Sequence, residues 1–358
     1  MSAVDDAVET PREATEASEE LRRLRMMMLI RRFEERTYQE YTRPGQRIGG
    51  FCHLYSGQEA IAVGVAAVFQ KGRDRLINGY RDHGHALALG MDPKAAMAEL
   101  FGRAAGCSRG KGGSMHFFDA ANGNMGGHGI VGGQIPLGIG IAFALKYLNT
   151  GGVCFTLFGD GAVNQGTHNE SLNLASLLKL PCVFIVENNG VAMGTQVGRH
   201  SAARDLVHRG CGYEMPARGF DGNDLDVVIA EVRQAADRAR AGEGPSYLVA
   251  NTYRFRGHSM SDPLKYRTRE EAERARQRDP ILLYQRRLWA KGTLNAEVLE
   301  QIEKEVAELV NAAVQFADQA PHPDLSELYT DVLAERYPLV KPASPADAAG
   351  RAAGAGGA

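Results

Sequence analysis

Residues 153–194 read VCFTLFGDGAVNQGTHNESLNLASLLKLPCVFIVENNGVAMG. The stretch holds two continuous apolar segments, 153–158 and 182–186, which are separated by the helix-like segment 169–178. Continuous apolar strands that alternate with helices are typical of a parallel sheet covered by helices on both faces. The sequence therefore predicts an α/β fold with this β-α-β unit near its centre.

The alternation of helices and strands continues on both sides of this unit. Further helices are predicted at 60–69, 137–148 and 224–241, and further strands at 75–78 and 246–252. Ser56 and Glu59 have the spacing of a capping box for the first of these helices. Beyond residue 268, apolar residues recur at helical spacing along one face, which predicts a helical C-terminal region.

The chain between its two ends is interpreted as one domain. Residues 19–341 contain no obvious linker and no internal repeat. Residues 1–18 are polar and aperiodic, and residues 342–358 consist mainly of Ala, Gly, Pro, Ser and Asp. Segments of this composition cannot bury enough apolar surface to fold, so we expect both ends to be disordered.

Charge and composition exclude several classes of partner. Lys and Arg total 41 against 43 for Asp and Glu, so the net charge of -2 gives no reason to expect binding to nucleic acid or to an anionic membrane. No apolar run is long enough to span a bilayer. The five cysteines are scattered without a CxxC pair, and the acidic N-terminus fits neither a signal nor a transit peptide. We therefore expect a soluble protein of the bacterial cytoplasm.

Polar residues follow both strands of the central unit. Gly159-Asp160-Gly161 ends the first strand, and Asn188-Asn189 ends the second. Because a right-handed crossover makes the strands parallel, Asp160 and Asn189 should meet at the carboxyl edge of the sheet, where ligands of α/β folds bind. A carboxylate and an amide oxygen suit Mg²⁺, and the following helix N-terminus offers N–H groups to a phosphate. The unit predicts a magnesium–diphosphate site, although either half alone is more often a plain turn.

Other glycine-rich stretches are less specific. Residues 106–133 have no helical or strand period and are predicted to form a long loop that wraps a cofactor. Gly138-Ile139-Gly140 lacks the third small residue of a dinucleotide fingerprint, because Phe143 stands there. Gly110-Lys111 is followed by Gly112, where a P-loop needs Ser or Thr. Both patterns are therefore rejected as nucleotide sites.

Besides the central unit, five stretches are informative, and they occur in the order found in one known family: 50–55, 79–84, 110–116, 129–132 and 256–263. With them, the chain resembles the α subunits of the thiamine diphosphate-dependent 2-oxo acid dehydrogenases, in particular those of the pyruvate dehydrogenase decarboxylating component. The resemblance covers roughly residues 20 to 335. It implies a thiamine diphosphate-binding fold with thiamine diphosphate and Mg²⁺ as cofactors.

The resemblance also implies a role for each matching residue. Mg²⁺ would be held by Asp160, Asn189 and the Val191 carbonyl, the diphosphate by Tyr80, Arg81, Arg254 and the backbone of Gly161 and Ala162, and the aminopyrimidine by the backbone of Gly129 and Val131. His53 and His258 would face the reacting centre, His258 from a mobile loop that also contacts the cofactor. The sequence independently favours the arginines, because each follows a predicted strand and a guanidinium can bind phosphate through two parallel hydrogen bonds.

The implied reaction is the oxidative decarboxylation of pyruvate, with transfer of the acetyl group to the lipoyl domain of an acyltransferase partner. A separate β subunit would supply a catalytic glutamate, so an α₂β₂ heterotetramer is expected. Two alternatives remain open: an acetoin or branched-chain 2-oxo acid dehydrogenase α subunit, and a non-catalytic Mg²⁺-nucleotide module. Residues 51–55 favour pyruvate. Ser259 lies where mitochondrial relatives are phosphorylated, and we predict no such control here.

Overall fold

The computed structural model describes residues 11–331. The chain divides into two compact units, Met1–His322 and Pro323–Ala358. In the second unit, the described residues form the 3₁₀ helix η4 (Leu325–Tyr329), whose apolar side chains are exposed and share no core. This division differs from the single domain expected over 19–341. The tail expected at 342–358 lies outside the described residues.

The first unit begins with a long helix that the sequence prediction shortened. Helix α1 spans Pro11–Thr42, so residues 11–18 are helical and the disordered extension expected over 1–18 is wrong for them. Residues 11–18 read PREATEAS, in which Arg, Glu and Ala have high helix propensity and the proline stands at the first position of the helix. Its polarity alone was therefore a poor guide to disorder.

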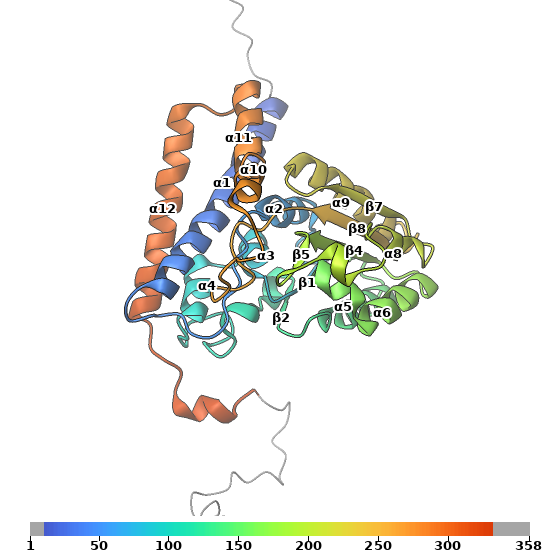
Figure 1. Cartoon of the computed structure of the whole chain (residues 1–358), viewed down its shortest axis with the longest axis horizontal. Helices are drawn as coiled ribbons and strands as arrows, with labels where there is room; N and C mark the ends of the chain where they lie inside the picture. Colours follow the sequence, from blue (N-terminus) through green and yellow to red (C-terminus); the bar gives the residue numbers. More distant parts are fainter. Residues whose placement is uncertain (1–10, 332–358) are drawn as a thin grey trace, which may run out of the picture. The chain divides into compact units, whose positions relative to one another are not determined.

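The predicted α/β fold is confirmed. Six parallel strands form one sheet in the order β2-β1-β3-β4-β8-β7 (Figure 1). Their bounds are β1 Arg75–Gly79, β2 Asn124–His128, β3 Cys154–Gly159, β4 Cys182–Asn188, β7 Ala217–Asp221 and β8 Ser246–Asn251. The β3 and β4 strands lie side by side with Gly159 opposite Glu187, so the residues that follow them emerge at one edge.

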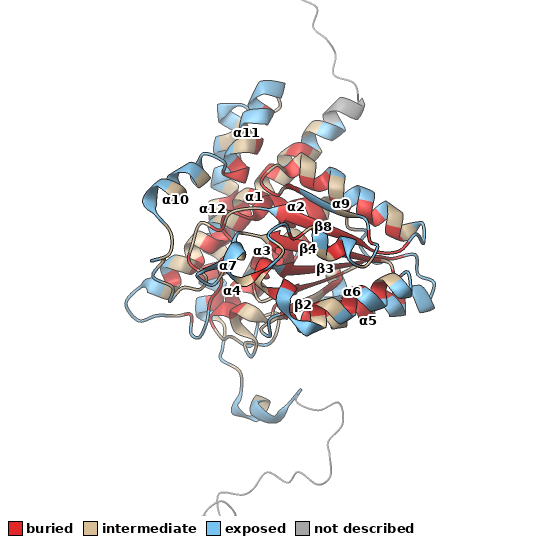
Figure 2. Ribbon diagram, turned by 45° about the vertical axis from the view of Figure 1, so that its right-hand side comes forward, coloured by how far each residue is buried: buried red, intermediate tan, exposed pale blue. Residues whose placement is uncertain are grey.

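Helices cover both faces of this sheet, and strand residues alternate between the two cores. Phe155 and Ile185 face one core, with α2 (Glu59–Val68) and α9 (Leu225–Arg240). Phe158, Phe184 and Val186 face the other, with α5 (Gln134–Tyr147) and α6 (Gly166–Leu177). Figure 2 shows the buried residues along the sheet and the inward sides of these helices. The period of two residues in a strand produces this division.

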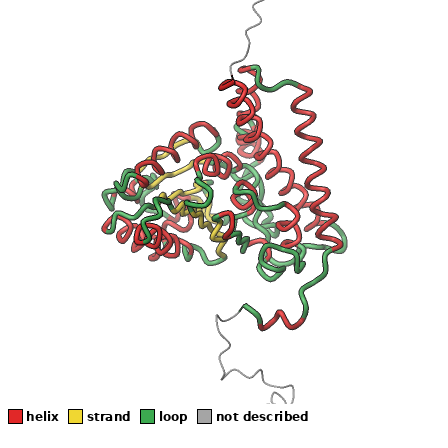
Figure 3. Tube along the Cα trace, turned by 180° about the vertical axis from the view of Figure 1, so that it is seen from behind, coloured by secondary structure: helices red, strands yellow, loops and turns green. Residues whose placement is uncertain are grey.

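The helical C-terminal region is also present. It consists of α10 (Arg269–Arg276), α11 (Pro280–Lys291) and α12 (Ala296–Gln319). Helix α12 runs alongside α1, as Figures 1 and 3 both show, and buries Ile302, Val306 and Val310. The remaining elements are α3 His83–Ala88, α4 Pro93–Leu100, η1 Gly113–Met115, η2 Ala120–Asn122, η3 Asp160–Asn164, β5 Val191–Ala192, β6 Thr195–Gln196, α7 Val197–His200 and α8 His208–Cys211.

Two local predictions were wrong. Strand β2 lies within the stretch 106–133, which was expected to be irregular. The strand has no apolar run and is held in the sheet by its pairing with β1. Ser56 and Glu59 form no capping box: α2 starts at Glu59, its N-cap Gln58 makes no side-chain cap bond, and the Glu59 carboxylate pairs with Arg31 instead. The helix predicted at 169–178 is α6 (Gly166–Leu177), and the turn between β3 and α6 is η3.

Within residues 11–331, no helix is both long enough and apolar enough to cross a membrane.

Candidate functional site

The carboxyl ends of the central strands open onto a cavity of about 850 Å³. Every site residue predicted from the sequence lines it: His53, Tyr80, Arg81, Gly129, Val131, Asp160, Gly161, Ala162, Asn189, Val191, Arg254 and His258. These residues come from segments far apart in the chain, and the parallel sheet brings them together. The structure thus places them at one site, whereas their individual roles stay predictions.

Asp160 and Asn189 provide oxygen atoms at the base of the cavity. Asp160 follows β3 and is 2% exposed, and its Oδ2 has no hydrogen-bond partner. Burial raises the pKa of its carboxyl group. The Asn189 Nδ2 donates to Gln58 Oε1 at 3.2 Å, which leaves the Asn189 Oδ1 on the side of Arg254. A buried carboxylate that is not fully hydrogen-bonded is expected where an additional group, such as a cation, binds to it.

The donor set at this position is suited to a hard cation. The described residues contain no cluster of three or more His, Cys, Asp or Glu side chains that could hold a metal ion. A cation would instead depend on one carboxylate, one amide oxygen and a backbone carbonyl from β5, the ligand types that Mg²⁺ accepts alongside phosphate oxygens. A Cβ atom on Gly161 would lie 2.9 Å from the Ala192 Cβ, so only glycine lets η3 approach β5 this closely.

Two buried guanidinium groups make the cavity attractive to anions. Arg81 donates to the carbonyls of Leu54 and His258 at 2.5 and 2.8 Å. Burial and the nearby Arg254 lower the pKa of Arg81 to about 10. Arg254 is 1% exposed and donates to the Tyr266 hydroxyl at 3.0 Å. Because charged groups are costly to bury beside one another, a site that holds both favours a negatively charged ligand.

Three aromatic rings gather at the other side of the cavity. The His53 ring lies 4.6 Å from Tyr80 and 5.2 Å from His258, measured between centroids. Burial, followed by the charge of Arg81, lowers the pKa of His53 to about 2 and that of His258 to about 4. The His258 backbone N–H donates to the Asp262 carboxylate at 2.6 Å, so a hydrogen bond within the loop holds the backbone of His258. Both imidazoles are therefore neutral near pH 7.

The sequence as a whole matches the model of the dehydrogenase E1 component family over residues 25–326. The chain belongs to the dehydrogenase E1 component family. It is 50% identical over 314 residues to the pyruvate dehydrogenase E1 component subunit alpha of Zymomonas mobilis, covering 87% of this chain and 88% of that protein. The corresponding subunit of Rhizobium meliloti is 50% identical over 316 residues, which cover 88% and 90% of the two chains. The mitochondrial testis-specific form of Rattus norvegicus is 44% identical over 312 residues, covering 87% of this chain and 78% of that protein.

Some cavity residues of this E1 component chain were not predicted from the sequence. Glu187 lines the cavity. Its Oε1 accepts a hydrogen bond from the Tyr55 hydroxyl and lies 3.0 Å from His85 Nε2. Its place directly before Asn188-Asn189 at the end of a strand was an available signal. Gln58 and Tyr266 also line the cavity. They lie outside any strand-end motif, so nothing in the sequence pattern marked them.

His83 and His116 are not among the residues that line the cavity. Burial opposes a charge on His83, but the pKa of His83 is raised because Glu34 lies 3.0 Å from its Nδ1. The other ring nitrogen of His83 lies 2.9 Å from the Ser114 hydroxyl, which accepts the His53 backbone N–H. His116 Nδ1 lies 3.2 Å from the Gly127 carbonyl. Both histidines thus have a structural role, because their contacts hold segments that border the cavity.

One wall of the E1 cavity is organised by a buried carboxylate. Glu99, at 0% exposure on α4, accepts four backbone N–H groups at 2.8 to 2.9 Å. The donors are Ser108, Gly110, Gly112 and Gly113. The glycine-rich loop is therefore wrapped around Glu99 rather than free in solution, and it leads directly to Met115, which lines the cavity.

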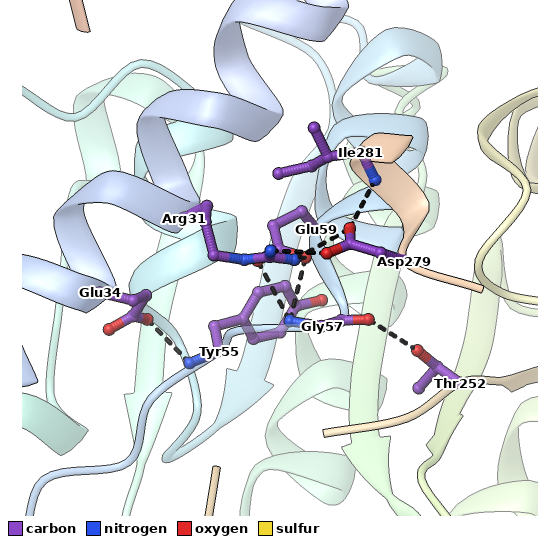
Figure 4. A network of polar contacts seen from close by, with 8 residues as sticks. All are labelled: Arg31, Glu34, Tyr55, Gly57, Glu59, Thr252, Asp279 and Ile281. Atoms are coloured by element: carbon purple, nitrogen blue, oxygen red, sulfur yellow. Dashed lines mark hydrogen bonds and ion pairs between the residues drawn. The ribbon is translucent and has the colours of Figure 1, made fainter. Parts of the chain in front are cut away.

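An ion-pair network supports the segment that carries Arg254 in this E1 chain (Figure 4). Arg31 of α1 binds Glu59 through two hydrogen bonds of 2.6 and 2.9 Å and Asp279 through bonds of 2.8 and 3.2 Å. Glu59 also accepts the Gly57 N–H, and the Gly57 carbonyl accepts the Thr252 hydroxyl at 3.3 Å. The network thus joins α1, α2 and α11 to the residues that follow β8.

Proposed function

We propose that the chain is the α subunit of a pyruvate dehydrogenase that binds thiamine diphosphate through Mg²⁺ in the cavity at the carboxyl edge of the sheet. The observation that carries the proposal is the buried, unpartnered Asp160 carboxylate beside Asn189, with the guanidinium groups of Arg81 and Arg254 in the same cavity. The names of the relatives support pyruvate as the substrate.

The chain's residues then divide into those that bind the metal and those that bind the diphosphate. Asp160, Asn189 and the Val191 carbonyl hold Mg²⁺. Tyr80, Arg81, Arg254 and the backbone of Gly161 and Ala162 bind the diphosphate, and the backbone of Gly129 and Val131 meets the aminopyrimidine. When bound, thiamine diphosphate supplies the carbon nucleophile for the keto group of pyruvate and the electron sink for decarboxylation.

His53 and His258 are proposed to act at the reacting centre as neutral imidazoles. Their lowered pKa values leave each ring with one N–H donor and one acceptor nitrogen near pH 7. A neutral ring can orient a carboxylate or keto group, and it can hold a proton at its acceptor nitrogen without placing a lasting charge beside Arg81. The Asp262 hydrogen bond fixes the backbone from which His258 projects.

A β subunit is the proposed partner, in an α₂β₂ heterotetramer. Helix α5 is predominantly apolar, and its outer side exposes Leu137, Phe143 and Tyr147 at 50%, 50% and 80%. On the neighbouring α6, Leu177 is 71% exposed. The surface continues to Ile130, which is 77% exposed and lines the cavity. An apolar helix with one uncovered side indicates a protein interface, and here the partner would also close the cavity and supply the catalytic glutamate.

The remaining parts of the proposal follow from the resemblance to the family. The acetyl group passes to the lipoyl domain of an acyltransferase, and the complex works in the bacterial cytoplasm without phosphorylation at Ser259. Acetoin and branched-chain 2-oxo acids are the alternative substrates, and no feature of the cavity favours them. A non-catalytic Mg²⁺-nucleotide module accounts for neither the buried histidines nor the family match.

The test is activity of the chain co-expressed with its β subunit. Pyruvate-dependent reduction of an artificial electron acceptor should require both thiamine diphosphate and Mg²⁺, and Asp160→Ala should abolish it. Asp237→Ala, which removes an exposed carboxylate on α9, is the matched control and should retain wild-type activity. Activity that persists without thiamine diphosphate would refute the proposal, and turnover of acetoin alone would change the substrate.

A further inference from the structure

Two buried polar atoms without hydrogen-bond partners face each other at the edge of the cavity. The His200 Nε2 lies 3.7 Å from the Asp160 Oδ2. Neither atom has another partner within hydrogen-bonding distance. His200 is the last residue of α7 and does not line the cavity, so it approaches Asp160 from behind. A pair of buried orphan atoms of complementary type indicates an interaction that is nearly formed.

The hydrogen bonds around His200 determine which nitrogen carries the proton. Arg209 donates to the Asn164 Oδ1 at 2.7 Å, which fixes the orientation of that amide group. The Asn164 Nδ2 therefore faces His200, and it donates to the Nδ1 at 3.0 Å and to the backbone carbonyl at 2.9 Å. Because Nδ1 accepts, the proton of the neutral ring is on Nε2 and points toward Asp160.

The same contacts hold the segment that contains His200. Arg209 also donates to the Ser201 hydroxyl at 3.1 Å. Asn164 belongs to η3, the turn that starts with Asp160, and α7 directly follows the β5–β6 hairpin that carries Val191. Arg209, Asn164 and His200 thus form a chain of polar contacts that ends on the Asp160 carboxylate.

We propose that His200 is a positioning residue for Asp160, which donates its Nε2–H to one carboxylate oxygen so that the other is oriented toward the cation. The inference rests on the proposed function. Carboxylates that bind metals are usually hydrogen-bonded from outside, and losing such a partner lowers metal affinity about 10- to 100-fold.

The test measures Mn²⁺ binding to the α/β complex by electron paramagnetic resonance at a fixed, saturating concentration of thiamine diphosphate. His200→Ala should weaken Mn²⁺ binding about 10-fold. His200→Gln keeps an N–H donor at a similar distance and should restore most of the affinity. His208→Ala, which removes an exposed histidine from the neighbouring α8, is the matched control and should bind Mn²⁺ like the wild type.

Hydrogen exchange provides a readout that does not depend on activity. Binding of the metal and cofactor should protect the amides of residues 197–201 in the wild-type complex, and His200→Ala should lose this protection while Tm changes little. A lower Tm with unchanged Mn²⁺ affinity would mean that His200 is only structural and would overturn the inference. Equal weakening by the Gln and Ala variants would likewise overturn it. A wild-type complex that binds no Mn²⁺ with thiamine diphosphate would refute the proposed function itself.

Discussion

Asp82 lies directly after Arg81, and its carboxyl group is fully buried. Its Oδ2 accepts the Phe117 backbone N–H at 2.9 Å, whereas its Oδ1 has no partner. Burial raises the pKa of Asp82 to about 7. The carboxyl group therefore takes up a proton more readily in the folded chain than in the unfolded chain, where the pKa of an Asp side chain is about 3.8.

This pKa predicts how stability depends on pH. Because the folded pKa is raised, the contribution of Asp82 is fully present below about pH 4 and is lost progressively as the pH rises to about 7. The Asn side chain of Asp82→Asn is uncharged at every pH and has nearly the shape of the protonated carboxyl group. The variant should therefore have a higher Tm than the wild type at pH 8 and a similar Tm near pH 4. Thermal unfolding of both proteins across this range tests the prediction, and parallel curves would contradict it.

At the residue scale, the sequence located the site well because the ends of strands carry a positional signal. Asp160 and Asn189 each follow an apolar strand, and the right-handed crossover then requires them to be close. No such signal marked Gln58 and Tyr266, because they enter the cavity through tertiary packing. His200 was missed for the same reason: it meets Asp160 only through the fold, and its partner Asn164 lies in a turn that no sequence pattern marked.

At the scale of elements, the predictions of strands succeeded for those strands whose two faces are both buried. The central strands β3, β4 and β8 are continuously apolar because each lies between two helical layers. Strands β2 and β7, at the two edges of the sheet, have the sequences NMGGH and ARGFD and were not predicted. Edge strands are defined by pairing with a neighbour, and pairing leaves little pattern in a short polar segment.

The ion pairs of Arg31 link several elements, so their loss should be severe. Arg31→Met would leave the buried Glu59 and the largely buried Asp279 without their cation, which should lower the free energy of unfolding by about 3 to 5 kcal/mol. Arg32→Met, at the next position of α1, removes a guanidinium that is 51% exposed and should change it by less than about 0.5 kcal/mol.

Chemical denaturation of the two variants measures the difference. Cofactor affinity provides a second comparison, because the network also supports the segment that carries Arg254. Equal stability of Arg31→Met and Arg32→Met would show that the network contributes nothing beyond a surface ion pair.

At the scale of the whole molecule, the uncovered side of α5 and α6 determines how the chain behaves. Leu177→Asp introduces a charge at a side chain that is 71% exposed, so the chain itself should fold normally. The charge would be buried in the proposed interface, and co-purification with the β subunit should fall at least about 10-fold. Leu282→Asp, at a side chain on α11 that is 42% exposed, is the control and should assemble normally.

Size-exclusion chromatography with light scattering distinguishes the outcomes. A heterotetramer formed equally by both variants would place the β subunit elsewhere on the chain. The sequence could not have identified this surface, because an apolar helix that faces a partner and one that faces the core have the same composition.

The apolar side of α5 also bears on the life of the protein in the cell. A newly made copy that has not met its partner presents the kind of surface that chaperones and proteases recognise in damaged proteins. Surplus copies should therefore be degraded, and the abundance of the complex should follow whichever gene is translated less. Synthesis of the two subunits in matched amounts is then a requirement of the surface itself, independent of any regulator.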